Sequence, residues 1–539
     1  MAAITRSAAV DEAGAGDIRG ALGTISLDDT APRAGLSAKL KTLLAIVGPG
    51  LIVMCGDNDA GAFSTYGQAG QNYGTRLLWT LLLLVPVLYV NQEMVLRLGA
   101  VTGVGHARLL IERFGRSWAG LMVVYLLILN ALTLVTEFIG ITMAAGYLGV
   151  PQLVAVLLAA GVILAAAATG SFRRFERIAV ALCAGSLLLI PLYLVSHPSG
   201  ASMVRGFTEP GLPGGSGQLA TVMLLIIGIV GTTVAPWQLF FQQSYVVDKR
   251  ITPRFIRYEK VDLWIGIVIV VVGAAALMGA VAAAFAGSPA AGHFTDATGL
   301  AHGIAAHAGR IAGAVFAVAL LDAAIIGAFA VSLSTAYAVG DTLGLKHSLN
   351  RGFRQAKGFY GIYAGLIAVA AAIVLIPHAP LGLIIEGVQA LAGVLLPAAT
   401  VFLLMLCNDR AVLGPWVNSR RTNIFTAAVI TVLIALSAVL TTSVVFPGIT
   451  GRQILFITGG CVTAAVAVGG TILVRSLRVR STVEIDRRDR ETWRMPPLNV
   501  LSKPVMSGGR KVALGVLGGY MGIAMILVMV RIIQLAVAS

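Results

Sequence analysis

Two carboxylates stand two residues apart in a stretch that is otherwise apolar. Asp57 and Asp59 belong to residues 48–61, GPGLIVMCGDNDAG. A second stretch rich in helix-breaking residues covers 231–238, GTTVAPWQ. Glycine and proline weaken a helix and leave carbonyl groups without intrahelical partners. Carbonyl oxygens, the negative dipole end of a half-helix and carboxylates together favour the binding of a cation.

The composition places these stretches in a membrane. Of the 539 residues, 57% are hydrophobic and 12% are charged, and the mean hydropathy is +0.88. Soluble domains carry roughly 25% charged residues. This chain therefore has too few charged side chains to cover the surfaces of several soluble domains. We expect a polytopic protein whose partner is the lipid bilayer, and no nucleic acid partner. The cysteines lack metal-binding spacing and are expected to be small buried residues: Cys55, Cys183, Cys407 and Cys461.

Apolar runs long enough to cross a bilayer recur along the chain. A helix needs about 20 residues to cross a ~30 Å hydrocarbon core, and a backbone in lipid must satisfy its own hydrogen bonds, which favours helices. The runs lie at 42–70, 76–98, 117–147, 151–169, 177–196, 217–245, 262–287, 308–340, 358–377, 380–406, 424–446, 454–474 and 512–535. Residues 1–40 are predicted to be a disordered cytoplasmic tail, 476–511 a basic cytoplasmic segment, and 512–539 an extra C-terminal transmembrane helix.

Positive charge is distributed unevenly between the two sides of this topology. With the N-terminus in the cytoplasm, 34 of the 39 Lys and Arg residues fall inside. Cytoplasmic segments of membrane proteins carry such an excess, so the net charge of +15 is first a marker of topology. Binding to anionic lipid is a secondary interpretation. We expect an integral protein of the inner or plasma membrane.

The two interrupted stretches occupy the first and the sixth run. Matched breaks of this kind are typical of transporters built from two inverted repeats, with the binding site between them. The predicted repeats cover 41–200 and 215–407, followed by helices 11 and 12 at 408–475. The alternative is that Asp57 or Asp59 only caps a half-helix, which leaves the matched positions of the breaks unexplained.

The residues around both breaks resemble those of the Nramp divalent-metal transporters, which carry Asp-Pro-Gly-Asn and Met-Pro-His there. The similar motifs are Gly48-Pro49-Gly50, Gly56, Asp59-Ala60-Gly61-Ala62, Asn91-Gln92-Glu93, Leu98-Gly99, Thr102-Gly103, Glu137-Phe138-Ile139-Gly140, Ala235-Pro236-Trp237, Gln389, Leu396-Pro397 and Asn408-Asp409. Together they cover about residues 42–475. The resemblance implies an all-α, leucine-transporter-like fold of 5+5 helices with broken helices 1 and 6, plus two or three C-terminal helices.

Departures from the family pattern change the expected cargo. The family's Asn ligand is Ala62 here, its Met ligand is Ala235, and its sixth-helix His residues are Trp237 and Gln242. A thioether favours transition ions, whereas Mg²⁺ usually keeps several waters and binds through one or two carboxylates. The pattern resembles the Nramp-related magnesium transporter clade. The expected transported substrate is therefore Mg²⁺, and also Mn²⁺, with no resident cofactor.

Obligatory proton coupling is expected to be absent. Leu134 stands at an Asp of the family's proton route, and Trp237 and Gln242 replace titratable residues, although the neighbouring Glu137 is kept. The membrane potential alone supplies ~2.3 kcal/mol per charge per 100 mV and drives a divalent cation inward.

Seven residues form the predicted metal site. Asp59 matches the family's binding Asp and is the first candidate for direct or water-mediated contact. Asp57 is either a second, outer carboxylate or an entrance or capping residue. The other members are Gly56 and Thr232 through carbonyls, Thr233 through its hydroxyl, Ala235 through its small size, and Gln389 through its amide. The supporting residues are Ala62, Pro236, Trp237 and Glu137. Gln389 is equally explained by an interhelical hydrogen bond. Trp237 is either a gate or bulk that packs against the first helix, and packing is the favoured interpretation.

Other polar residues receive weaker assignments. Glu93 is expected to pair with Arg97 one turn away, and Glu386 to pair with a basic group or to line the outer pathway. Asp322 is left unassigned. Three loop histidines are expected to be solvated rather than to collect metal: His293, His302 and His307.

Three further functions remain as alternatives. The first is a proton-coupled Mn²⁺/Fe²⁺ importer of the ordinary Nramp type, and the second an amino-acid or polyamine carrier of the same architecture. The third is a non-transport role such as a membrane sensor. An enzyme is not expected, because the sequence carries no nucleophile–base pair, HExxH motif or Cys/His cluster. The sequence does not set the oligomeric state, and a monomer is compatible with it.

Overall fold

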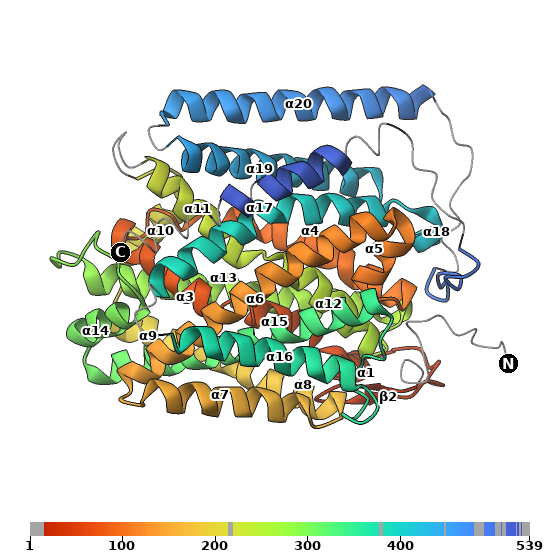
Figure 1. Ribbon diagram of the computed structural model, residues 1–539, viewed down its shortest axis with the longest axis horizontal. Coiled ribbons are helices and arrows are strands. Elements are labelled where there is room, and N and C mark those ends of the chain that lie inside the picture. The colour runs from red at the N-terminus through yellow and green to blue at the C-terminus, as the bar shows by residue number, and fades with distance from the viewer. Residues whose placement is uncertain are drawn as a thin grey trace.

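The computed structural model describes residues 16–213, 219–376, 381–446, 449–478, 490–501, 508, 514–523, 525–527 and 530. The long helices run side by side in one bundle (Figure 1). Nine helices of the described part are long and apolar enough to cross a membrane, and the pair α1–α2, bent by 53°, adds a tenth. The predicted all-α membrane architecture is confirmed.

The first half of the chain contains the first broken helix and the spans that follow it. Its helices are α1 (Leu36–Ile46), α2 (Pro49–Cys55), α3 (Ala60–Tyr73), α4 (Trp79–Thr102), α5 (His106–Phe114), α6 (Arg116–Tyr147), α7 (Gln152–Ala167), α8 (Phe172–Cys183), the 3-10 helix η2 (Ala184–Leu188), α9 (Leu189–Ser196) and α10 (Gly200–Thr208). The run predicted at 177–196 is thus interrupted by a 3-10 turn, and α5 and α10 are short helices outside the predicted spans.

The second half repeats the broken helix and adds the C-terminal spans. Its helices are α11 (Leu219–Thr233), α12 (Pro236–Asp248), the 3-10 helix η3 (Pro253–Phe255), α13 (Ile256–Phe285), α14 (Ala297–Ala308), α15 (Arg310–Leu343), α16 (Lys357–Val374), α17 (Leu381–Cys407), α18 (Arg410–Leu413), the 3-10 helix η4 (Gly414–Trp416), α19 (Arg420–Val445) and α20 (Gly451–Arg478). Short α14 lies between two spans and was not predicted.

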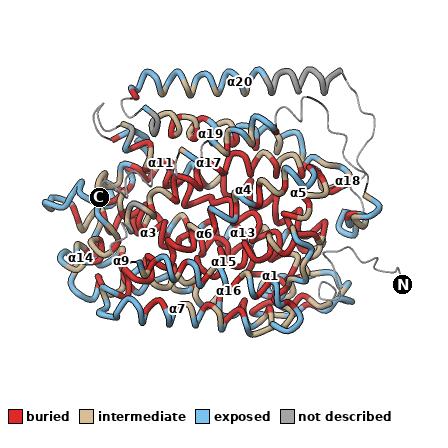
Figure 2. Tube along the Cα trace, in the orientation of Figure 1, coloured by how far each residue is buried: buried red, intermediate tan, exposed pale blue. Residues whose placement is uncertain are grey.

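Burial separates central from peripheral helices (Figure 2). The most apolar window of α11–α12 is 94% buried, whereas that of α8–α9 is 22% buried. A membrane helix that is buried on all sides must be covered by other helices rather than by lipid. The second broken helix is therefore at the centre of the bundle, and α7, α16 and α20 lie at its edge (Figure 1).

Both predicted interruptions are present. Residues 56–59 separate α2 from α3, and Val234 and Ala235 separate α11 from α12. Pro236 occupies the first turn of α12, where its missing N–H is harmless. The breaks in helices 1 and 6 are confirmed.

The N-terminal segment differs from the predicted disordered tail over the part that is described. Strands β1 (Ile18–Arg19) and β2 (Thr24–Ile25) form a short hairpin. Its turn residue Ala21 donates its N–H to Glu176 Oε2 at 2.6 Å. This long-range anchor orders a segment whose composition alone gives no sign of structure; residues 1–15 lie outside the described part.

Of the predicted C-terminal helix at 512–535, residues 514–523 and 525–527 are described as helical. Tyr520 forms a hydrogen bond with Ser437 of α19, and Gly518 packs against Trp118 of α6. Of the basic segment predicted at 476–511, residues 476–478, 490–501 and 508 are described, and the rest lies outside the described residues.

The two ends of the bundle differ in their short elements. Helices α5 and α18 and the β1–β2 hairpin lie at one end, and α10 and α14 at the other (Figure 1). The segments predicted to be cytoplasmic, such as 97–116 and 410–421, share the first end, which we call the basic end.

Candidate metal site

The two helix breaks meet at the centre of the bundle. The phenol oxygen of Tyr66 in α3 lies 2.6 Å from Thr233 Oγ1 at the end of α11. From the start of α12, the Gln238 amide donates a hydrogen bond to Asp57 Oδ1. These contacts bring together residues about 170 positions apart in the sequence. The breaks therefore form one polar centre, as the matched positions predicted.

Asp59 begins the second half of the first broken helix. Its Oδ1 accepts the Ala62 N–H at 2.8 Å, so it is the N-cap of α3. The side chain is buried, at 2% exposure. Its second oxygen is not needed for capping. The capping role and a role in binding are therefore compatible in the same residue.

Gln389 of α17 lies beside Asp59. A Cβ on Gly61 would stand 1.7 Å from Gln389 Nε2 and 3.1 Å from Asp59 Oδ1. Only glycine fits at position 61. Because Gly61 has no side chain, the Gln389 amide can approach the Asp59 carboxylate. Among the described residues Gln389 Nε2 has no hydrogen-bond partner. The alternative explanation for Gln389 was an interhelical hydrogen bond. The NH₂ group of its amide makes no such bond with the described residues.

Glu137 of α6 lies on the other side of Asp59. A Cβ on Gly327 would lie 2.8 Å from Glu137 Oε2 and 2.9 Å from Asp59 Cβ. Glu137 Oε2 accepts the Ala60 N–H at 3.2 Å, and its Oε1 has no partner in the described part of the chain. The two carboxyl groups are therefore buried neighbours, and two carboxylates this close repel each other when both are charged.

Asp57 is the more completely enclosed of the two aspartates, with no exposed surface. Gln238 occupies Oδ1, and within the described residues Oδ2 has no partner. A buried carboxylate oxygen without a partner is strongly unfavourable. Since Asp57 is not an N-cap in this structure, its capping alternative finds no support in the geometry.

A chain of amides leads from Asp57 toward α4. Gln238 Oε1 accepts a hydrogen bond from Gln92 Nε2 at 2.7 Å. The side chains of both glutamines are fully buried. Neither glutamine was among the predicted site residues, although Gln238 directly follows Pro236-Trp237 and Gln92 belongs to one of the motifs that resemble the family. An amide inside an apolar run was the available signal for both.

The atoms at this centre that are free to bind a metal are mostly oxygens. Thr232 Oγ1 is buried and, in the described part, unpartnered, whereas Thr233 Oγ1 also donates to the carbonyl of Ile229 at 2.6 Å. Rotation of the Gln389 amide by half a turn would present its oxygen instead. Carboxylate, hydroxyl and amide oxygens are ligands for hard cations.

The positions where the resemblance implies thioether and imidazole ligands hold Ala235, Trp237 and Gln242, none of which supplies such a ligand. Ala235 stands at the break with 5% exposure. The ring of Trp237 packs over the first break, with Cη2 3.5 Å from a Cβ built on Gly56, and its carbonyl accepts from Ser334 at 2.8 Å. Trp237 thus has the packing contacts expected of a structural residue. Gln242 is buried with both amide atoms unpartnered among the described residues.

No group of three or more His, Cys, Asp or Glu side chains arranged to hold a metal occurs among the described residues. The centre offers carboxylates together with neutral oxygens instead. Such a site suits an ion that keeps part of its water shell, because water then fills the remaining coordination positions.

Several other polar residues lie away from this centre. Glu93 pairs with Arg97 at 3.0 Å, as predicted. Glu386 accepts from Gln68 at 2.6 Å, so its partner is a neutral amide rather than the basic group that was expected. Asp322 lies against Gly185 of η2.

Two of the three histidines expected in a loop, His302 and His307, lie in α14 and have separate contacts. His302 packs edge-on against Tyr147, and a ring nitrogen of His307 lies 3.1 Å from the carbonyl of Ser196. Each ring is thus engaged with a different element, which does not support a shared metal-collecting patch.

Comparisons with known proteins agree with the geometry. The profile of the Natural resistance-associated macrophage protein-like family, Nramp, matches residues 50–443. The divalent metal cation transporter MntH of Pectobacterium carotovorum is 30% identical over 256 residues, which are 46% of this chain and 60% of that protein. MntH of Ralstonia nicotianae is 29% identical over 401 residues, 71% of this chain and 87% of that protein.

A structural comparison supports the same fold. A crystal structure of the Eremococcus coleocola manganese transporter superposes with a TM-score of 0.61 at 19% identity, covering 86% of this chain and 98% of the other.

Proposed function

The chain belongs to the Nramp family, and from this we propose that it carries divalent metal cations across the membrane by alternating access, with Mg²⁺ as the main cargo and Mn²⁺ as a second. The direction is into the cytoplasm, with the N-terminus and the basic end on the cytoplasmic side. The relatives named as divalent metal cation transporters support metal transport. The preference for Mg²⁺ rests on the residues of this chain.

The observation that carries the magnesium assignment is the donor set at the two breaks. Asp57 Oδ2 and Thr232 Oγ1 are buried oxygens without partners among the described residues, and Ala235 supplies no thioether. A site without sulfur or imidazole has no built-in preference for Mn²⁺ and Fe²⁺ over Mg²⁺. Mg²⁺ needs few protein ligands because it keeps several waters.

The geometry suggests how the cation is held and released. Asp59 binds from the N-terminus of α3 while Asp57 binds from the unwound segment, and the C-terminal carbonyls of α2 and α11 add negative potential. Without a cation, Asp57 has the Gln238 amide as its one hydrogen-bond partner among the described residues. A buried free carboxylate is unfavourable. The empty site therefore favours either the binding of another cation or an opening of the site to one side, which lets water reach the carboxylate.

We propose that the inward membrane potential drives this movement without obligatory proton coupling. Leu134 and Trp237 leave two positions of the family's proton route without a titratable group. The potential acts on two charges per ion, at ~2.3 kcal/mol per charge per 100 mV.

A second candidate function is proton-coupled Mn²⁺/Fe²⁺ import, and one observation favours it. The carboxyl groups of Asp59 and Glu137 are buried neighbours on either side of Gly327, and since two adjacent carboxylates repel each other, a proton held between them is favoured. Binding of a cation to Asp59 would displace that proton, and a proton displaced in every cycle is the basis of coupling. The two candidates therefore differ in where this proton goes.

The deciding experiment is uptake of Mg²⁺ and Mn²⁺ into proteoliposomes with a pH-sensitive dye inside, for the wild type and Asp59→Ala. Saturable Mg²⁺ uptake that is lost in the variant, with an unchanged dye signal, is the expected result. Mn²⁺ uptake alone, with acidification in proportion to the metal moved, would assign the chain to the proton-coupled class.

A further inference from the structure

A pocket lies at the basic end, away from the helix breaks. It has a volume of about 410 Å³ and is formed by α4, the start of α13, the η4 segment and the start of α19. Its charged and aromatic lining residues include Glu93, Arg97, Lys260, Trp416, Arg421 and Arg490. Four of these carry positive charge and one carries negative charge, so the pocket has a net positive lining.

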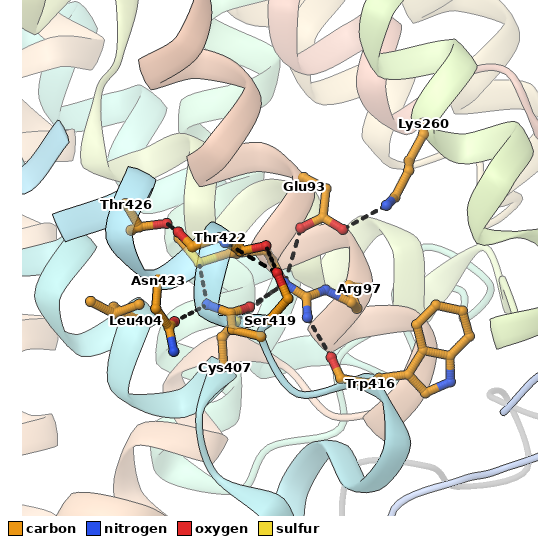
Figure 3. Close-up of polar contacts among 12 residues, drawn as sticks. Glu93, Arg97, Lys260, Leu404, Cys407, Trp416, Ser419, Thr422, Asn423 and Thr426 are labelled. Carbon is orange, nitrogen blue, oxygen red and sulfur yellow. Dashed lines mark hydrogen bonds and ion pairs between the residues drawn. The ribbon is translucent and has the colours of Figure 1, made fainter. Parts of the chain in front are cut away.

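Glu93, the one carboxylate among these lining residues, has both of its oxygens in ion pairs. Glu93 Oε2 lies 3.0 Å from Arg97 Nη2 and Oε1 lies 2.8 Å from Lys260 Nζ (Figure 3). Arg97 also donates to Asn418 Oδ1 at 2.6 Å and to the carbonyl of Trp416. Glu93 thus has no oxygen left to neutralise the remaining cations of the pocket.

Two arginines of the pocket have no carboxylate partner among the described residues. Arg421 makes no ion pair or hydrogen bond there through its side chain. The guanidinium of Arg490 lies 5.0 Å from the centre of the Trp416 ring, and Trp416 Nε1 donates to the Arg490 carbonyl at 2.7 Å. Trp416 therefore holds Arg490 at the pocket, and no carboxylate of the described part of the chain neutralises its charge.

The start of α19 adds further donors to the same pocket. Ser419 is the N-cap of this 26-residue helix, its Oγ accepts the Thr422 N–H at 3.1 Å, and both residues line the pocket. A helix N-terminus favours an anion through its free N–H groups and its dipole. Arginine side chains and a helix N-terminus that converge on one cavity match an oxyanion ligand.

One wall of the pocket is apolar and continues onto an exposed apolar surface. Tyr89 and Phe425 line it, and Phe425 is 46% exposed. Tyr89 stacks on Trp264 at 5.0 Å, and Trp264 is 43% exposed on α13. Tyrosine and tryptophan concentrate at membrane interfaces. A ligand that fits both walls has an anionic head and apolar chains.

We propose that this pocket binds the headgroup of an anionic phospholipid from the leaflet at the basic end. The phosphate lies between Arg421, Arg490 and the start of α19, and the acyl chains follow Phe425 and Trp264. Basic pockets between membrane helices on the cytoplasmic side are suited to such headgroups. The proposal does not depend on which metal the protein carries.

The test measures lipid retained by the full-length protein. Detergent-purified protein is exchanged into mixed micelles of phosphatidylglycerol and phosphatidylcholine with matched acyl chains, and bound lipid is quantified by mass spectrometry. The wild type is expected to enrich phosphatidylglycerol. In the double variant Arg421→Gln/Arg490→Gln the enrichment should fall by about fivefold for each arginine removed. The control is Arg420→Gln, which removes one exposed charge next to the pocket but not from its lining.

Three results would contradict the proposal. The first is equal retention of both lipids by the wild type, and the second is unchanged enrichment in the double variant. The third comes from an arm with inorganic phosphate and delipidated protein. If phosphate stabilises the protein through Arg421 and Arg490, and phosphatidylglycerol adds nothing to that effect, the ligand is a free anion rather than a lipid.

Discussion

The ammonium group of Lys249 lies 2.7 Å from Oε1 of Glu176, and neither side chain has any exposed surface. Lys249 also donates to the carbonyls of Ile46 and Val47, at 2.6 and 2.9 Å, where α1 bends into α2. The other oxygen of Glu176 accepts from the N-terminal hairpin at Ala21. One buried ion pair thus ties the end of α12, the start of the first broken helix and the hairpin together at the basic end.

Replacement of Lys249 by methionine should destabilise the protein strongly. The substitution leaves the Glu176 carboxylate and two carbonyl groups buried without their donor, and a buried pair that loses one partner typically costs about 3–5 kcal/mol. The measurement is the thermal unfolding temperature in detergent. Lys346→Met, at an exposed position, is the matched control and should leave it unchanged. Equal unfolding temperatures for both variants would mean that the ion pair contributes nothing.

Substitutions of Asp59 can separate capping from binding. Asparagine can still accept the Ala62 N–H that Asp59 Oδ1 now accepts, whereas alanine cannot, and loss of an N-cap typically costs about 1 kcal/mol. We expect Asp59→Ala to lower the unfolding temperature and Asp59→Asn to preserve it. Both variants should lose Mg²⁺ uptake in proteoliposomes, because both lack the carboxylate charge.

Normal uptake by Asp59→Asn would be the contrary result. It would indicate that Asp59 only caps α3 and that the cation binds elsewhere at the two breaks.

A thioether introduced at Ala235 should shift the selectivity toward Mn²⁺. This residue lies at the second break with 5% exposure, where the resemblance implies a methionine ligand. We expect Ala235→Met to raise the ratio of Mn²⁺ to Mg²⁺ uptake on the order of tenfold, because sulfur favours transition ions.

The control for this shift is Ala235→Leu, which adds similar volume without sulfur. If leucine changes the ratio as much as methionine does, the effect is one of cavity size, and the argument from ligand softness fails.

Local patterns predicted some features well. The breaks at residues 56–59 and at Ala235 followed from glycine and proline, which act on the backbone directly. The Glu93–Arg97 pair followed from its spacing of four residues on one helix. In each of these cases the physical cause lies within a few residues of its effect.

Contacts between distant segments could not be predicted in the same way. Gln238 and Asp57 are 181 positions apart, and Lys249 and Glu176 are 73 apart. Which helices become neighbours depends on how the whole bundle packs, and no local spacing carries that information. The hairpin at residues 18–25 was missed for the same reason, because Glu176 anchors it.

The contact between His347 and Asp341 predicts a pH-dependent part of the stability. His347 follows the end of α15, and its Nε2 lies 3.0 Å from Asp341 Oδ1. Burial lowers the pKa of His347, but the hydrogen bond and the charge of Asp341 outweigh it and raise the pKa to about 9. In the unfolded chain the pKa is about 6.5.

Because the folded pKa lies above the unfolded one, the stabilisation is complete below about pH 6.5 and is lost as the pH rises through about 9. It amounts to at most roughly 3 kcal/mol. We expect His347→Gln to unfold at a lower temperature than the wild type at pH 6, with a difference that shrinks and closes near pH 10. His293→Gln, in an exposed loop, should show no such difference at either pH. A constant difference for His347→Gln across this range would show that the imidazole acts through packing, and that its charge does not contribute.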